Sequence, residues 1–216
     1  MKKLLALVLA LVMSMSLVTI SNAAFKDADK IDYKEAVDVM NAVGVFIGDE
    51  KGNFNAKDNL TREQAAKIIA YLELDSKAAD TLVGGATFTD VASTRWSAGF
   101  VGYCAKAGVV AGVGNGKFDP AGQLTALQFG KMLLTAVGYG VNGEYTGSGW
   151  EIAVASDASA LGIYDGLVGS LAGSQPMTRD EMALYAFNTL VGVAQVNYNS
   201  VFGEYYIGTS ALTAVD

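Results

Sequence analysis

Three short segments of the chain carry the same signal for the start of a helix. Each has an apolar residue, then a Thr, then a Gln or Glu three positions after that Thr, at residues 60–64, 124–128 and 177–181. In such a capping box, the Thr hydroxyl and the side-chain oxygen of the Gln or Glu each accept a hydrogen bond from a backbone N–H that the first helical turn leaves without a partner. One box is common by chance, but three boxes after similar polar loops predict a repeated unit.

The spacing of glycines and aromatic residues supports the repeat. Each box is preceded by two glycines four residues apart, and an aromatic residue stands 11 or 12 positions before the first of them. The glycine pairs are Gly44/Gly48, Gly108/Gly112 and Gly162/Gly166, and the aromatic residues are Tyr33, Trp96 and Trp150. Glycine at a helix C-terminus ends the helix, so each unit is expected to contain a first helix opened by the aromatic residue, a loop and a second, capped helix.

A helix-loop-helix unit cannot bury its apolar face by itself, so three copies are expected to share one core. We therefore predict a mainly α fold with repeats at residues 25–75, 88–139 and 145–192. The third repeat is eroded: Thr178 follows Thr125 by 53 residues, whereas Thr125 follows Thr61 by 64. It also lacks the Gly-x-Phe segment present in the other two.

The two ends of the chain differ from the repeats. Lys2 and Lys3 precede an apolar run and then small residues, which predicts a secretory signal peptide at residues 1–23, with an uncleaved membrane anchor as the alternative. No later segment approaches the length of a membrane span. Residues 193–216 are rich in β-forming side chains and are interpreted as the start of a further domain or as a truncated tail.

Charge and residue content restrict the chemistry. Without the signal peptide, 13 basic residues face 22 acidic ones, a net charge of −9, which argues against nucleic-acid binding. The chain has no histidine and one cysteine, Cys104, which lies in an apolar run and is interpreted as a core residue. Triads that need histidine and the usual zinc sites are therefore excluded. We expect no cofactor and no catalysis, since Glu144 and Glu151 belong to no recognisable motif.

The loop at residues 49–58 superficially suggests a calcium loop. Lys51 occupies the third ligand position and the glycine is misplaced, so no metal is predicted. A weaker site of oxygen ligands at Asp49, Asn53, Asn55 or Asp58 stays open beside the simpler interpretation of a solvated polar loop.

Taken together, the motifs resemble the S-layer homology (SLH) repeat of bacterial surface proteins. The resemblance lies in the order Phe-x-Asp, Trp, Gly-Val-Val-x-Gly, Gly-x-Phe-x-Pro and Leu-Thr-Arg-x-Gln. The second repeat carries the first four elements most clearly, at residues 88–120, and the first repeat carries the last at residues 60–64. The resemblance covers residues 25–190, nearly all of the mature chain.

The resemblance implies a three-pronged pseudo-trimer of repeats, secreted to the cell wall or cell surface. It also implies non-covalent attachment of an exported protein to a secondary cell-wall polymer, typically one with pyruvylated sugars, in grooves between repeats. In the family, the Arg after the capping Thr, the aromatic that opens the first helix and loop glycines contribute to the ligand site. Transferred to this sequence, the ligand-binding residues are Arg62, Arg179, Trp96, Trp150, Tyr33, Gly48 and Gly112.

Physical chemistry supports the same residues. An Arg directly after a capping Thr can offer two parallel donors to a carboxylate, and an indole face suits the apolar side of a sugar ring. The alternatives are that Arg62 and Arg179 pair with neighbouring acids such as Glu63 or Asp180, and that the tryptophans are core residues. The second repeat has Ala126 in place of the Arg, so fewer than three working grooves are expected.

Two other functions remain as alternatives. The chain could be a lattice-forming surface-layer subunit that uses its repeats for self-association, or the remnant anchor of a hydrolase that acts on the wall.

Overall fold

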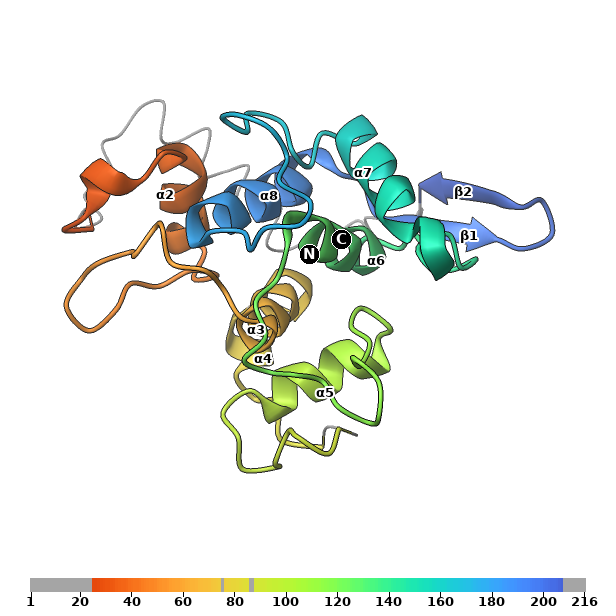
Figure 1. The fold of residues 1–216 in the computed structure, drawn as a ribbon, viewed down its shortest axis with the longest axis horizontal. Coiled ribbons are helices and arrows are strands. Elements are labelled where there is room, and N and C mark those ends of the chain that lie inside the picture. The colour runs from red at the N-terminus through yellow and green to blue at the C-terminus, as the bar shows by residue number, and fades with distance from the viewer. Residues whose placement is uncertain (1–24, 75, 86–87, 208–216) are drawn as a thin grey trace, which may run out of the picture.

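The computed structural model describes residues 25–74, 76–85 and 88–207 (Figure 1). In chain order, the elements are η1 (Ala28–Lys30), α2 (Lys34–Ala42), α3 (Arg62–Leu74), α4 (Ser76–Ala79), α5 (Ala98–Lys106), α6 (Ala126–Ala136), η2 (Gly147–Gly149), α7 (Trp150–Ala160), α8 (Arg179–Gly192), β1 (Val196–Asn199) and β2 (Glu204–Ile207). The predicted mainly α fold is confirmed. The predicted signal peptide and the last residues of the predicted tail, 208–216, lie outside the described residues.

All three predicted capping boxes form. At the start of α3, the N–H of Thr61 donates to Oε1 of Gln64 (2.8 Å), and the N–H of Gln64 donates to the Thr61 hydroxyl (3.4 Å). The same reciprocal pairs open α6 and α8. These bonds satisfy donors that would otherwise be unpaired at the helix starts.

The three capped helices, α3, α6 and α8, form the centre of the molecule (Figure 1). Their starts are joined by short antiparallel β-bridges, Thr61 with Gln123, Thr125 with Pro176 and Asn59 with Thr178. The backbone N–H of Arg62 also donates to the Gly122 carbonyl, and that of Arg179 donates to the Asp58 carbonyl, both at 2.8 Å. Each of these two helix starts is therefore docked on a loop from another part of the chain.

The outer helices pack in a shifted order. Helix α5 lies against α3, α7 against α6, and α2 against α8, which gives the three lobes seen in Figure 1. The first helix of each predicted repeat thus packs mainly on the second helix of another repeat, and the contact of α2 with α8 closes the ring. Of the three aromatic residues expected to open these helices, Trp150 does so, whereas Tyr33 and Trp96 stand just before α2 and α5.

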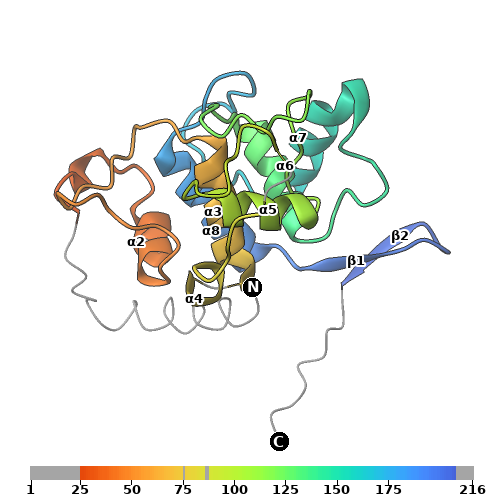
Figure 2. The same cartoon turned by 90° about the horizontal axis from the view of Figure 1, so that it is seen from below.

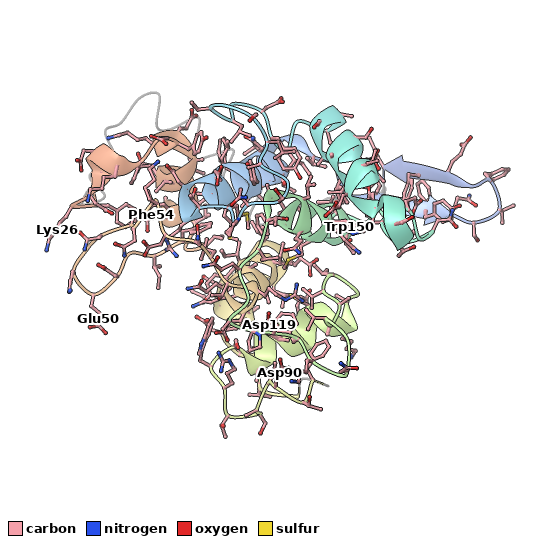
Figure 3. All side chains as sticks on the ribbon, in the orientation of Figure 1. Lys26, Glu50, Phe54, Asp90, Asp119 and Trp150 are labelled. Carbon is pink, nitrogen blue, oxygen red and sulfur yellow. The ribbon has the colours of Figure 1, made fainter. Side chains whose placement is uncertain are left out.

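Aspartates explain why Phe-x-Asp recurs before the first two outer helices. Asp27 accepts hydrogen bonds from the N–H groups of Phe54 (2.7 Å) and Asn55 (2.8 Å). Asp90 accepts from the next loop in the same way, from Phe118 and Asp119, both at 2.8 Å. Figure 3 labels Asp90 and Asp119 in the lobe that contains α5. Each carboxylate therefore fixes the polar loop that leads to a capping Thr.

The core is continuous through the three lobes. It contains side chains from every helix from α2 to α8, with Cys104 fully buried and its thiol 3.3 Å from the Ala66 carbonyl. Burial raises the pKa of Cys104, as expected for a core thiol. Within the residues described, no helix is both long and apolar enough for a membrane span.

The predicted β-forming tail is a two-stranded antiparallel hairpin that projects from the helices (Figure 2). It is attached to the region after α6: the Val196 N–H donates to the Val137 carbonyl (2.9 Å), and the Tyr205 hydroxyl donates to Glu144 (2.6 Å). Helix α8 ends at Gly192, directly before the predicted tail, although its last turn contains the β-branched residues Thr189 and Val191. Buried contacts of Thr189 and Leu190 with the core outweigh the weak helix propensity of this stretch.

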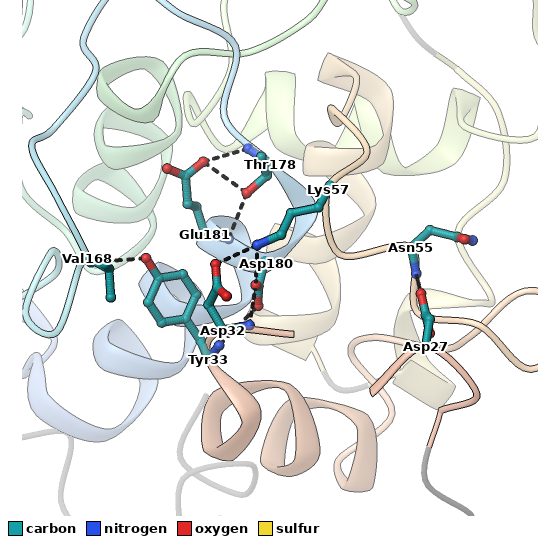
Figure 4. A network of polar contacts seen from close by, with 9 residues as sticks. All are labelled: Asp27, Asp32, Tyr33, Asn55, Lys57, Val168, Thr178, Asp180 and Glu181. Carbon is teal, nitrogen blue, oxygen red and sulfur yellow. Dashed lines mark hydrogen bonds and ion pairs between the residues drawn. The ribbon is translucent and has the colours of Figure 1, made fainter. Parts of the chain in front are cut away.

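Asp180 is the main polar link that closes the ring (Figure 4). Its carboxylate, which is fully buried, accepts hydrogen bonds from the N–H groups of Asp32 (2.7 Å) and Tyr33 (3.4 Å), and Lys57 lies 3.5 Å away. We expect Asp180→Ala to lower the free energy of unfolding by about 2 kcal/mol, because it removes the buried acceptor of two partly buried backbone donors. Urea denaturation followed by circular dichroism measures this. Glu50→Ala, at an exposed loop position, is the control, and equal stability of the two variants would contradict the assignment.

Candidate ligand-binding grooves

Arg62, the first residue of α3, reaches the loop that follows α5. Its Nε donates to the Phe118 carbonyl and its Nη2 to the Ala111 carbonyl, both at 2.8 Å. The guanidinium carbon lies 4.6 Å from the centre of the Phe118 ring. The arginine of the first predicted repeat is thus oriented by the loop of the second.

A cavity of about 260 Å³ lies beside Arg62. Its lining includes Gly112, Gln128, Lys131 and Trp150, and we call this set, with Arg62, the second groove. The Lys131 ammonium donates to the Tyr145 carbonyl (2.7 Å) and lies 5.3 Å from the centre of the Trp150 ring system. Two cations and an indole therefore share one groove.

Arg179, the first residue of α8, has a matching position against the loop after α2. Its Nη2 donates to the Ile47 carbonyl (2.6 Å), and its guanidinium carbon lies 4.8 Å from the Phe54 ring centre and 5.2 Å from that of Phe46. Its Nε is buried and has no hydrogen-bond partner within the described residues. A buried N–H without a partner is costly, so this atom is a candidate donor to a ligand.

Two adjoining cavities, of about 190 and 230 Å³, meet at Arg179. One is lined by Gln64, Lys67 and Trp96, and the other by Gly48 and polar side chains of residues 49–59. We call Arg179, Gly48, Gln64, Lys67 and Trp96 the first groove. It repeats the composition of the second groove, with an arginine, a lysine, a glutamine, a glycine and a tryptophan.

Neither arginine pairs with an acid in the part of the chain that the structure describes. Glu63 is bonded to Arg95, and Asp180 lies near Lys57, so the alternative of neighbouring ion pairs is not what the structure contains. Burial lowers the pKa of Arg62 and of Arg179, but a guanidinium titrates so far above neutrality that both stay charged. Each groove therefore holds an arginine that forms no ion pair, although Asp49 and Asp58 line the cavity beside Arg179 and attract its charge at longer range.

Neither tryptophan is fully buried in the core, although Trp150 packs against it. Trp96 is 54% exposed and Trp150 is half-buried, and each lines the cavity beside an arginine. An indole at the wall of a cavity, beside a cation, offers an apolar face that a ligand could contact.

The lysines and glutamines of the grooves were missed by the sequence analysis. Lys67 and Lys131 each stand six residues after a capping Thr, and Gln64 and Gln128 are the capping-box residues themselves. The shared register of the lysines was a usable signal. It was overlooked because a lysine on a helix is usually only solvated.

The place that corresponds to the two grooves contains Ala126, Leu184 and Tyr33, and we call it the third position. Its chemistry differs from that of the grooves. Ala126 replaces the arginine, and its carbonyl accepts a hydrogen bond from the Tyr164 hydroxyl (3.2 Å). Leu184 stands where the other grooves have lysine. The Tyr33 hydroxyl accepts a hydrogen bond from the Val168 N–H (3.1 Å; Figure 4), and Tyr33 lines none of the three cavities beside Arg62 and Arg179.

Gly48 and Gly112 lie where loop backbone and an aromatic ring approach closely. A Cβ at Gly48 would lie 2.8 Å from the Phe25 ring, and one at Gly112 would lie 2.6 Å from the Lys117 carbonyl oxygen. Each glycine also lines one of the cavities, so the absence of a side chain affects the shape of the groove as well as the packing of the loop.

The loop that hinted at oxygen ligands is ordered by its own hydrogen bonds. The Asp49 carboxylate accepts from the N–H groups of Lys51 (2.9 Å) and Asn53 (2.8 Å) and from the side-chain amides of Asn53 (3.2 Å) and Asn55 (3.1 Å). These bonds hold the pKa of Asp49 well below its usual range. In the described chain, no three acidic or thiol side chains gather in a way that could hold a metal ion.

The family comparison agrees with two of the repeats. The family model described as "S-layer homology domain" matches residues 24–66 and 87–128. These segments fall on the first and second predicted repeats and end within α3 and α6. The third predicted repeat, residues 145–192, remains a prediction.

Curated proteins similar to the chain include a "Surface layer protein" of Brevibacillus choshinensis, 30% identical over 77% of this chain and 15% of its own length. A "Surface-layer 125 kDa protein" of Lysinibacillus sphaericus is 30% identical over 85% of the chain and 16% of its own length. A "Cell surface protein" of Thermoanaerobacter kivui is 29% identical over 99% of the chain and 28% of its own length. The chain thus matches only a minor part of each of these proteins.

The close approach at Gly112 gives a test of groove packing. We expect Gly112→Ala to lower the free energy of unfolding by roughly 2 kcal/mol, because the added methyl group overpacks the loop against Lys117 and Phe88. Thermal and urea denaturation measure the loss. Gly149→Ala is the control, since a Cβ there meets nothing within 4 Å. A Gly112→Ala protein as stable as this control would show that the close contact does not matter.

Proposed function

We propose that the chain attaches to the bacterial cell wall by binding a secondary cell-wall polymer, one bearing pyruvylated sugars, in the first and second grooves. The attachment is non-covalent, and the chain holds itself and any domain linked to it at the cell surface.

One observation carries the proposal. In each groove, an arginine is held by a backbone carbonyl and an aromatic face, with no carboxylate partner, beside a lysine and a tryptophan. A pyruvyl group presents a carboxylate, which an arginine binds with charge-assisted hydrogen bonds. The tryptophan offers an apolar face to the sugar ring. Since the whole chain carries a net charge of −7, an anion needs such locally placed cations.

The comparisons support the cellular setting. Two segments match the S-layer homology domain, and the similar proteins are named as surface-layer or cell-surface proteins. A secreted, cell-surface location follows from both, and the proposal is a binding role and not a catalytic one.

The third position is proposed to bind the polymer weakly or not at all. Ala126 and Leu184 remove both cations, and Glu181 adds a carboxylate where the other grooves have a neutral glutamine. An anionic sugar would therefore meet repulsion without a compensating donor.

A second candidate is self-assembly as a surface-layer subunit. The similar proteins from Brevibacillus choshinensis and Lysinibacillus sphaericus favour it, since both are named as surface-layer proteins. Electron microscopy of the purified chain distinguishes the two: ordered arrays without polymer support self-assembly, and dispersed particles that bind polymer support attachment.

Substitution of the groove arginines tests polymer binding. We expect Arg62→Ala and Arg179→Ala each to weaken binding to purified pyruvylated wall polymer roughly tenfold, since each removes a charge-assisted contact. The double variant should not co-sediment with the polymer. Lys106→Ala removes an exposed charge outside the grooves and should bind normally. Undiminished binding by a folded double variant would rule the proposal out.

Binding stoichiometry tests the number of working grooves. Isothermal titration calorimetry with a short pyruvylated fragment of the wall polymer should give two sites per chain. A chain that takes up three equivalents with similar affinity would contradict the assignment of the third position as inactive.

A further inference from the structure

Glu63 links α3 to the segment before α5 through three hydrogen bonds. Its carboxylate accepts hydrogen bonds from Arg95 Nε (2.7 Å) and Nη2 (2.8 Å) and from the Ser97 hydroxyl (2.5 Å). Glu63 is only 6% exposed, and Ser97 is fully buried. A bidentate, partly buried pair of this kind has a fixed geometry.

The two donors flank Trp96, the exposed indole of the first groove. Trp96 precedes α5, and its ring centre lies 6.3 Å from that of Phe100, which leaves much of the indole in solvent. Packing alone gives such a side chain little restraint. Hydrogen bonds on both neighbouring residues fix the backbone that carries it, and so set the direction of the indole.

Asp180, at the same place in α8 as Glu63 in α3, has a corresponding role at the third position. Glu63 stands two residues after Thr61, and Asp180 stands two residues after Thr178. Asp180 accepts hydrogen bonds from the N–H groups of Asp32 and Tyr33, so it fixes the aromatic residue ahead of α2 (Figure 4).

The second groove lacks this contact. Leu127 occupies the equivalent place in α6, and Trp150 lies within the first turn of α7, beside Lys131. Its indole is held by a helix and a cation, so it needs no carboxylate. The two grooves therefore share their composition but differ in how the tryptophan is fixed.

We propose that Glu63 is a positioning residue for the first groove: through Arg95 and Ser97 it holds Trp96 at the cavity that Arg179 lines. The inference rests on the proposed polymer binding. Because the adjacent Arg62 belongs to the second groove, two consecutive residues of α3 serve different grooves. A change at Glu63 should affect the first groove and spare the second.

The ionisation of Glu63 is consistent with this role. Burial by itself would raise its pKa, but the hydrogen bonds from Arg95 and Ser97 outweigh that effect and lower the pKa below its usual value. The carboxylate therefore stays charged at neutral and mildly acidic pH.

The test uses Glu63→Gln in the full chain, on two backgrounds. Arg62→Ala leaves the first groove as the working site, and Arg179→Ala leaves the second. In Glu63→Gln, an amide N–H₂ group faces donors of Arg95, so the bidentate pair is lost. Calorimetry with purified pyruvylated wall polymer should show roughly tenfold weaker binding on the Arg62→Ala background and a change below about twofold on the other.

Glu151→Gln is the matched control, because Glu151 is an exposed acid next to Trp150 in the second groove. It should leave both affinities unchanged. Equal losses on the two backgrounds would mean that Glu63 acts only through general stability, and no loss would mean that it does not position Trp96. Either result overturns the inference.

A second readout does not depend on polymer. In Trp150→Phe, Trp96 is the one remaining tryptophan of the two in the chain. Adding Glu63→Gln to this variant should increase the quenching of Trp96 fluorescence by acrylamide and lower the anisotropy of that fluorescence. If the parent chain fails to bind polymer, the proposed function fails, and unchanged fluorescence then separately overturns the inference.

Folding is checked by circular dichroism. If Glu63→Gln loses the helical spectrum, Arg95→Met removes the same bidentate pair from its more exposed partner and keeps the aliphatic length. The same selective loss in the first groove is expected for it, and its absence would also count against the inference.

Discussion

The structure depends on backbone hydrogen bonds that dock a capped helix on a loop from another part of the chain. The N–H of Arg62 donates to Gly122, and that of Arg179 donates to Asp58. Each bond uses a donor that the first turn of a helix leaves unpaired, so docking costs no intrahelical bond. It also places the arginine side chain beside the neighbouring loop. The grooves are therefore a consequence of how the units are joined.

The docking of helix starts on loops also has an electrostatic consequence. The chain is acidic overall, yet each groove concentrates a half-buried arginine and a lysine, and the acids next to the arginines in sequence form their polar contacts with other residues. Glu63 is bonded to Arg95, and Asp180 accepts backbone N–H groups near Lys57. Under the proposed function, this arrangement would let an acidic protein attract an anionic polymer at two defined places without a general attraction for polyanions. It is also the basis for the proposal that the third position, which has Ala126 in place of an arginine, is inactive.

Local sequence patterns predict most of the helices and some of the residues of the candidate site. Thr61 and Gln64 are three residues apart, so their capping box depends on local geometry only. The loop that contacts Arg62 could not be predicted in this way. It lies about fifty residues further along the chain, and its contact with Arg62 depends on which helices pack together. Periodicity shows that α2 and α5 have an apolar face, but it does not say which central helix covers it. Tyr33 had the right spacing, yet its hydroxyl is used by a loop that no local pattern identifies.

The central claim is that each groove combines an arginine and a tryptophan from different predicted repeats. A double-mutant cycle on binding of a short pyruvylated fragment of the wall polymer tests it most directly. Alanine substitutions of Arg179 and Trp96 should be coupled by more than about 0.5 kcal/mol, and so should those of Arg62 and Trp150. Arg62 and Trp96 should be additive, because they line different grooves. Coupling of Arg62 with Trp96, and none of Arg179 with Trp96, would contradict the account.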